Sequence, residues 1–157
     1  GAELIRVADF SGDIAEYDRL AFGCSAMGDE VLEEEEFEPF FAAIEGALSG
    51  KNIALFGSYG WGDGEWMRNW EDRVKEDGAV LVGGEGLIAN EAPSDEDLEK
   101  CRELGTELGA AAFYFIALVS NTAIPYRKIY FRINRTVRMY ISGFTSFPLP
   151  QIRCSKV

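Results

Sequence analysis

The chain has 157 residues, including 27 acidic residues, 15 basic residues and no histidine, so its formal net charge is -12 at pH 7. This length suits one domain with a packed core. Such an acidic surface argues against a nucleic-acid partner, because both would carry negative charge. The lack of histidine excludes histidine-based catalytic triads and histidine metal sites. Cys24, Cys101 and Cys154 have no paired spacing, so we expect neither a zinc site nor a disulfide framework, which fits a reducing cytoplasm.

The charge is unevenly distributed along the chain. Residues 1–107 hold all 27 acidic residues and 8 of the 15 basic ones, whereas residues 108–157 hold 7 basic residues and no acidic one. Such asymmetry predicts two parts of different role or origin. We therefore expect a domain over residues 1–110 and a basic, apolar C-terminal tail over residues 111–157.

The predicted elements alternate between strands and helices in chain order. Strands are expected at 4–7, 19–24, 52–56 and 79–82, the last with a continuation toward residue 88. Helices are expected at 37–48 and 65–76, and from a cap at Ser94 to about residue 109. This alternation predicts an α/β protein with a parallel, doubly wound sheet.

Ligands of such sheets bind outside the carboxyl ends of the strands. The loops at that end are 24–30, 57–64 and 89–93, and their composition is unusual. Met27 and Trp61 each follow a strand, so both side chains could contact one flat ring from its two faces. The alternative is that these two side chains simply cover the end of the sheet.

Two long motifs resemble a known family. The segments are 23–34 (GCSAMGDEVLEE) and 54–64 (ALFGSYGWGDG), and shorter matches lie at 37–40, 66–68 and 90–91. They resemble the ring-binding loops of short-chain flavodoxins of the clostridial type, and the resemblance covers residues 3 to about 110. It implies a flavodoxin-like fold, a three-layer doubly wound parallel sheet.

The resemblance implies a carrier of single electrons that uses flavin mononucleotide (FMN), and not an enzyme. It implies a cytoplasmic protein whose partners are redox proteins with basic surfaces, such as reductases and ferredoxin-dependent enzymes. The acidic charge of this chain would steer docking to such partners. No catalytic residue and no metal site is expected.

The resemblance also implies a set of FMN-binding residues. They are Ser25, Ala26, Met27, Gly28, Asp29, Glu30, Ser58, Tyr59, Gly60, Trp61, Gly62 and, less directly, Asn90. In the family's pattern Met27 would pack on one ring face and Trp61 on the other. The Gly28–Asp29 peptide would turn over on reduction, so that its carbonyl accepts from the ring N5–H. Glu30 would accept from the ring N3–H.

The sequence departs from the family at its start. Flavodoxins begin with a strand, a hydroxyl- and glycine-rich loop that binds the phosphate, and a helix, and no such loop occurs here. The match begins at what would be the second strand, so we expect an N-terminally truncated flavodoxin fold with impaired FMN binding. The missing strand lies inside the family's sheet, so the strand at 4–7 would lack a neighbour.

Three interpretations of the tail are open. It could be unrelated sequence after a truncated start, or a membrane anchor or interaction segment. A membrane anchor is disfavoured because the apolar run 110–119 is shorter than the roughly 20 residues that span a bilayer. Alternatively, residues 112–119 supply a replacement strand, followed by a helix with Ile129, Ile133, Val137 and Ile141 at four-residue spacing.

Other functions are weighed against the electron carrier. A flavin-free interaction module with the same fold, such as a response-regulator-like receiver, would need an acidic phosphorylation pocket and a lysine at a later strand end, and the Met27 and Trp61 loops fit it poorly. A truncated, non-functional fragment is a further alternative. A flavodoxin-like reductase would need a pyridine-nucleotide motif, and none is visible. A cation site at Asp29, Glu30 and residues 33–36 is disfavoured because no regular ligand spacing supports it.

Overall fold

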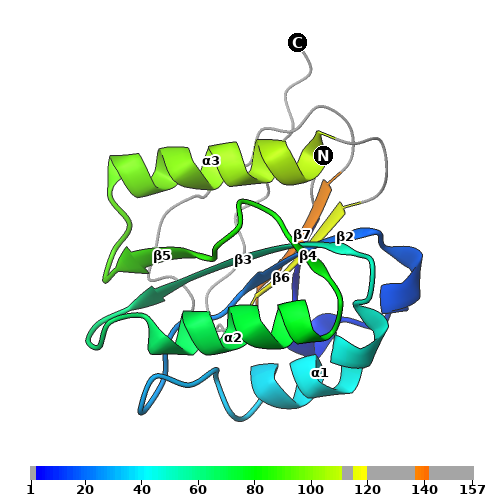
Figure 1. The fold of residues 1–157 in the computed structure, drawn as a ribbon, viewed down its shortest axis with the longest axis horizontal. Helices are drawn as coiled ribbons and strands as arrows, with labels where there is room; N and C mark the ends of the chain where they lie inside the picture. The colour runs from blue at the N-terminus through cyan, green and yellow to red at the C-terminus, as the bar shows by residue number, and fades with distance from the viewer. Residues whose placement is uncertain (1–2, 111–114, 120–136, 142–157) are drawn as a thin grey trace.

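The structure is a computed structural model that describes residues 3–110, 115–119 and 137–141. Its strands are β1 (Glu3–Arg6), β2 (Arg19–Gly23), β3 (Asn52–Tyr59), β4 (Val80–Leu81), β5 (Leu87–Asn90), β6 (Phe115–Val119) and β7 (Val137–Ile141). Its helices are α1 (Phe37–Ile44), α2 (Glu65–Glu76) and α3 (Asp95–Gly109), with 3₁₀ turns at Val7–Asp9, Ile14–Glu16 and Glu45–Ala47. The sheet forms the middle of three layers, with α1 and α2 below it and α3 above it in Figure 1.

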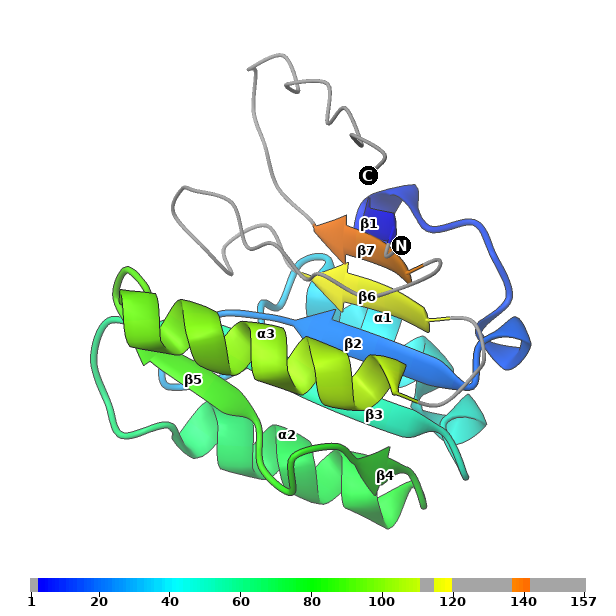
Figure 2. The same ribbon diagram turned by 90° about the horizontal axis from the view of Figure 1, so that it is seen from above.

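The sheet is parallel throughout the part of the chain that the structure describes. Its order is β1-β7-β6-β2-β3-β4, and β5 also pairs with β3 (Figure 2). The pairing of β2 with β3 runs in register from Arg19 opposite Asn52 to Gly23 opposite Phe56. The prediction of a three-layer, flavodoxin-like parallel α/β fold is thus confirmed.

Strand β3 is longer than its apolar run predicts. Residues 57–59, expected in a loop, continue the strand because β5 pairs with it from Phe56 opposite Leu87 to Tyr59 opposite Asn90. The expected single strand after α2 is instead split into β4 and β5. Gly83 and Gly84, each at φ +80°, break it, since this backbone conformation does not belong to a strand.

Two strands of the tail join the sheet. Residues 115–119 pair with β2, Arg19 lying opposite Phe115 and Gly23 opposite Val119, and they also pair with β1. They occupy the place expected of a replacement strand. Residues 137–141 form β7 beside β6 and β1, so the predicted helix through Val137 and Ile141 is wrong there. Their β-branched and aromatic residues suit a strand, and β6 supplies a backbone partner. Ile129 and Ile133 lie outside the described residues.

Local interactions set the helix boundaries. At α3, Ser94 and Asp97 form a reciprocal capping box, and these hydrogen bonds lower the pKa of Asp97. The predicted cap at Ser94 is confirmed. Helix α1 ends at Ile44, before the predicted position, because its last turn tightens into the 3₁₀ turn Glu45–Ala47.

No helix in the described part of the chain has the length and apolar character needed to cross a membrane.

The largest buried side chains lie between the sheet and the helices α1 and α2. The Trp70 ring of α2 lies nearly perpendicular to the rings of Phe37 and Phe41 of α1, at ring-centroid distances of 5.2 and 5.6 Å. Leu104 and Leu108 of α3 are buried on the opposite face of the sheet. Strands β2 and β3 are buried in this packing, and their carboxyl ends carry the loops singled out by the sequence.

We predict that β6 and β7 stabilise the folded chain. Among the described strands, β1 pairs only with these two. Deleting residues 111–157 should lower the free energy of unfolding by more than about 2 kcal/mol, because several backbone hydrogen bonds of about 0.5–1.5 kcal/mol each are lost. Urea denaturation followed by circular dichroism measures this loss. Deleting only residues 142–157 retains both strands and serves as the control. Equal stability of the longer deletion and the intact chain would contradict the prediction.

Candidate functional site

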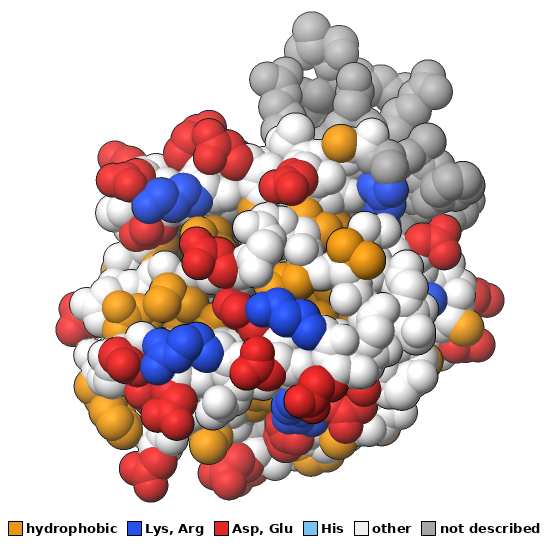
Figure 3. Space-filling model, in the orientation of Figure 1, with side chains coloured by type: hydrophobic (Ala, Val, Ile, Leu, Met, Phe, Trp, Pro, Cys, Tyr) orange, Lys and Arg blue, Asp and Glu red, His pale blue; other side chains and the backbone are white. Residues whose placement is uncertain are grey.

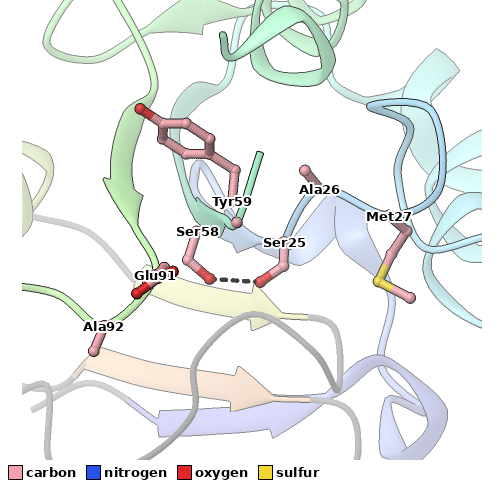
Figure 4. Close-up of a pocket in the computed structure, with 8 residues that line it drawn as sticks. Ser25, Ala26, Met27, Ser58, Tyr59, Glu91 and Ala92 are labelled. Carbon is pink, nitrogen blue, oxygen red and sulfur yellow. Dashed lines mark hydrogen bonds between the residues drawn. The ribbon is translucent and has the colours of Figure 1, made fainter. Parts of the chain in front are cut away.

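A cavity of about 500 Å³ lies at the carboxyl ends of β2 and β3 (Figure 4). This volume is within the range of small-molecule sites. Three loops contribute to its wall, which is lined by Ser25, Ala26, Met27, Ser58, Tyr59, Gly60, Glu91 and Ala92. In Figure 4, Met27 and Glu91 lie on opposite sides of a pair of serine side chains. The cavity therefore opens where the sequence predicts a ligand.

The serine pair joins the ends of the two central strands. The Oγ atoms of Ser25 and Ser58 are 2.9 Å apart, and both residues are buried. Below them, a Cβ added to Gly57 would lie 2.1 Å from the carbonyl oxygen of Cys24. The same carbonyl accepts a hydrogen bond from Trp66 Nε1 at 3.2 Å. Only glycine permits this approach, which brings the first two loops together.

The first loop is a tight turn closed by a pair of backbone hydrogen bonds. Met27 and Val31 exchange N–H···O bonds of 2.9 Å in both directions. Gly28 has φ +47° and Glu30 has φ +53°, so the turn between them uses left-handed backbone. Glycine at position 28 adopts this conformation without the steric cost that a Cβ would bring. Gly28 and Asp29 are exposed at the tip of the turn.

The second loop leaves β3 at Tyr59 and enters α2 at Glu65. Its Trp61 is 62% exposed and is not among the residues that line the cavity. Arg68 holds the end of the loop through hydrogen bonds to the backbone oxygen and the Oδ1 of Asp63, at 2.8 and 2.6 Å. The hydrogen bond to Asp63 raises the pKa of the Arg68 guanidinium. The Tyr59 ring points away from the serine pair in Figure 4 and packs near Trp66, with centroids 5.6 Å apart.

The third loop is fixed to the end of β3. The Tyr59 carbonyl accepts hydrogen bonds from the Glu91 N–H at 2.7 Å and from Asn90 Nδ2 at 3.3 Å. Glu91 has φ +52°, a left-handed conformation, and lines the cavity together with Ala92. Asn90 thus uses its side chain to hold the backbone of the second loop.

The structure brings six of the twelve predicted site residues to the cavity wall. They are Ser25, Ala26, Met27, Ser58, Tyr59 and Gly60. The other six lie on the same three loops but do not line the cavity, namely Gly28, Asp29, Glu30, Trp61, Gly62 and Asn90. Glu91 and Ala92 line it without having been predicted individually. Both lie in the loop 89–93, which the sequence singles out by its position and composition, and the shorter family match at 90–91 includes Glu91.

The side chains that line the cavity suit a flat, mostly neutral ring. Ala26, Met27 and Ala92 offer apolar surface, and the serine hydroxyls can donate or accept. Among the described residues no lysine or arginine lines the cavity, so these residues offer no side-chain cation to a phosphate. No group of three acidic or cysteine side chains that could hold a metal ion occurs within residues 3–110. The residues present fit the ring of a flavin.

The fold and the cavity define a class of protein, the doubly wound parallel α/β proteins that bind a ligand at the carboxyl ends of their central strands. Comparisons with known proteins narrow the class. A family model described as Flavodoxin matches residues 1–105. The flavodoxin of Clostridium beijerinckii is 50% identical over 105 residues, which cover 66% of this chain and 75% of that protein.

The flavodoxin of Megasphaera elsdenii is 44% identical over 104 residues, covering 66% of this chain and 73% of that protein. The solution structure of two-electron reduced Megasphaera elsdenii flavodoxin matches with a TM-score of 0.54 at 41% identity, covering 62% of this chain and 69% of that chain. The chain belongs to the flavodoxin family. Proteins of this family bind FMN and transfer electrons to and from partner proteins, and they are not enzymes.

We predict that Gly57 is essential for the close approach of the first two loops. A methyl group at Gly57→Ala would collide with the Cys24 carbonyl, so the free energy of unfolding should fall by at least about 2 kcal/mol. Gly60→Ala is the matched control, because no atom lies within 4 Å of an added Cβ there. The free energy of unfolding of Gly60→Ala should differ from that of the unmodified chain by no more than about 0.5 kcal/mol. Urea denaturation of the flavin-free chain compares the two variants, and equal losses would refute this role.

Proposed function

We propose that this chain carries single electrons by means of FMN bound at the cavity between the ends of β2 and β3. The observation that carries the proposal is that both long family motifs converge on this one cavity. Bound FMN would supply the chemistry, since a flavin ring can take up and release electrons one at a time. The chain's own residues would hold the ring and control its surroundings.

The first two loops would hold the ring from its two faces. Met27 lines the cavity with a polarizable thioether, and the exposed Trp61 is available to cover the ring. The turn at Gly28 and Asp29 would present a backbone carbonyl to the ring edge, and Glu30 would present a carboxylate. Ser25 and Ser58 would offer hydroxyls at the cavity floor, while Ala26, Tyr59, Gly60, Gly62 and Asn90 would shape the enclosing loops.

Negative charge around the cavity would influence both the bound ring and its partners. Asp29, Asp63, Glu65 and Glu91 are exposed acids on the three loops and at the start of α2. Such carboxylates disfavour additional negative charge in the cavity. On the face of the molecule shown in Figure 3, acidic side chains outnumber basic ones. We infer that partners with basic surfaces dock at the cavity end of a cytoplasmic carrier.

Exposed apolar side chains support docking at the same end. Five large hydrophobic residues among those described are exposed, and Met27, Val31 and Trp61 lie on the first two loops. An apolar patch surrounded by acids is a common form of protein interaction site. Through this patch a bound ring would come close to a partner.

The binding proposal is tested by titrating FMN into the flavin-free chain. We expect saturable binding at micromolar FMN with quenching of tryptophan fluorescence, mostly that of Trp61, because Trp66 and Trp70 are buried. Trp61→Ala should weaken binding about 5- to 10-fold, the value of one aromatic stacking contact, without changing apoprotein stability. Trp61→Phe keeps a ring and is the control. Unchanged affinity of Trp61→Ala would place the flavin elsewhere, and no saturable binding in the unmodified chain would remove the proposed function.

The docking proposal is tested with a basic haem protein as the electron acceptor. Stopped-flow oxidation of the reduced, FMN-loaded chain should slow several-fold as ionic strength rises from low to physiological, because salt screens the attraction. The variant Asp29→Asn, which removes one exposed charge at the tip of the first loop, should show a smaller salt effect. Glu76→Gln lies at the far end of α2, roughly 16 Å from its start at 1.5 Å per residue, and is the control. A similar decrease in the salt effect for both variants would argue against docking at the cavity end.

A further inference from the structure

The resemblance implies that the Glu30 carboxylate accepts from the N3–H of the flavin ring. In the structure this carboxylate makes further hydrogen bonds that such a role does not require. Its Oε1 accepts hydrogen bonds from the N–H groups of Gly64 at 2.7 Å and Glu65 at 2.9 Å. Its Oε2 accepts one from the N–H of Asp63 at 3.2 Å. One side chain of the first loop therefore takes three consecutive backbone donors from the second loop.

These donors lie at the start of α2, where backbone N–H groups have no partner within the helix. The N-cap residue of α2 is Gly64, which has no side chain with which to cap the helix. Glu30 supplies the missing acceptor from more than 30 residues earlier in the chain. Its negative charge is also favoured at a helix N-terminus.

The backbone of both loops is shaped around this contact. A Cβ added to Gly62 would lie 2.3 Å from Glu30 Cδ and within 2.7 Å of both carboxylate oxygens, so only glycine leaves room for the carboxylate. Glu30 itself has φ +53°, a conformation that non-glycine residues seldom adopt. The Met27–Val31 bridge fixes the turn that presents it.

Glu33 provides an internal comparison in the same stretch of chain. Its carboxylate also accepts three backbone N–H groups at a helix start, those of Glu35, Glu36 and Phe37. That contact is local, since all three donors lie within four residues of Glu33. Glu30, in contrast, connects two loops that are separated by the whole of α1 and β3.

We propose that Glu30 is a positioning residue that latches the Trp61 loop to the Met27 loop before any flavin binds. The latch belongs to the polypeptide alone, and its effect on flavin binding rests on the function proposed above. A carboxylate oxygen has two lone-pair directions, and Oε2 uses one of them for Asp63. Glu30 can therefore hold the latch while keeping an acceptor for a donor on the ring.

Hydrogen exchange of the flavin-free full-length chain tests the latch directly. In Glu30→Ala, the amides of Asp63, Gly64 and Glu65 should exchange about 10- to 100-fold faster, the value of lost hydrogen bonds to a charged group. Amides of residues 35–37, held by Glu33, should be unchanged and report that the fold persists. Asp29→Asn, which removes a neighbouring charge in the same turn, should leave exchange at 63–65 unaltered.

A second variant tests the same contact from the other side. Gly62→Ala keeps the carboxylate but obstructs its position, and alanine is also strained at the φ of +89° found there, so exchange at 63–65 should be faster. In the double variant Glu30→Ala with Gly62→Ala, the increase in exchange rate at 63–65 should not exceed the larger of the two single increases, because one contact cannot be lost twice. Unchanged exchange at 63–65 in Glu30→Ala, or full additivity of the two substitutions, would overturn the latch.

Measurements of FMN binding distinguish a failure of the latch from a failure of the proposed carrier function. With the latch lost, Glu30→Ala should release FMN several-fold faster, and the emission of Trp61 in the flavin-free chain should shift as its loop moves. If Glu30→Ala weakens FMN binding while exchange at 63–65 stays at the unmodified level, Glu30 contacts only the ring and the latch is wrong. If the unmodified chain binds no FMN yet the exchange rises as expected, the latch stands and the carrier function fails.

Discussion

The site depends on one constraint, the parallel pairing of β2 and β3 up to the point where their loops diverge. The hydrogen-bonded register continues beyond the strands, with Cys24 N–H donating to Phe56 and Ala26 N–H donating to Ser58. Glycine at position 57 lets the two backbones meet there without a side chain between them. Because the strands are buried on both faces, this approach is fixed by the core. The cavity is thus a consequence of how the sheet ends.

The loops around the cavity are held by contacts that need no ligand. The first loop is closed by its own backbone bridge, the second is bound by Arg68 and Glu30, and the third by the Tyr59 carbonyl. Left-handed residues at Gly28, Glu30 and Glu91 occur in these loops, where the chain must turn sharply over the strand ends. A site built in this way can receive a flat ring with little reorganisation, which favours affinity.

The sequence predicted the class of fold and the loops of the site for clear physical reasons. Apolar runs buried on both faces, amphipathic helices and the cap at Ser94 are local signals, and the structure contains these elements close to the expected positions. It did not predict the extension of β3 to Tyr59, because that extension depends on pairing with β5. It did not predict the break at Gly83 and Gly84 either, because glycine can occur in a strand as well as in the left-handed backbone found here. The strand at 137–141 was missed because four-residue spacing also fits a helix.

At the site, sequence identified the loops better than the individual contacts. Met27 and Ser58 line the cavity as expected. The Glu30 carboxylate accepts hydrogen bonds from backbone N–H groups of the second loop, a contact that no linear motif indicates. Glu91 and Ala92 entered the wall through a left-handed turn that a single sequence does not reveal. Contacts between loops that lie 30 residues apart arise only once the sheet has placed them.

The central claim is that a flavin ring lies at the ends of β2 and β3 against Met27 and Trp61. Nuclear Overhauser contacts between protons of the bound flavin ring and these two side chains, in an isotope-labelled, FMN-saturated sample, test it most directly. The account predicts contacts from the ring to both side chains, with the largest amide shift changes in residues 24–30, 57–64 and 90–92. Ring contacts confined to other parts of the chain would contradict it.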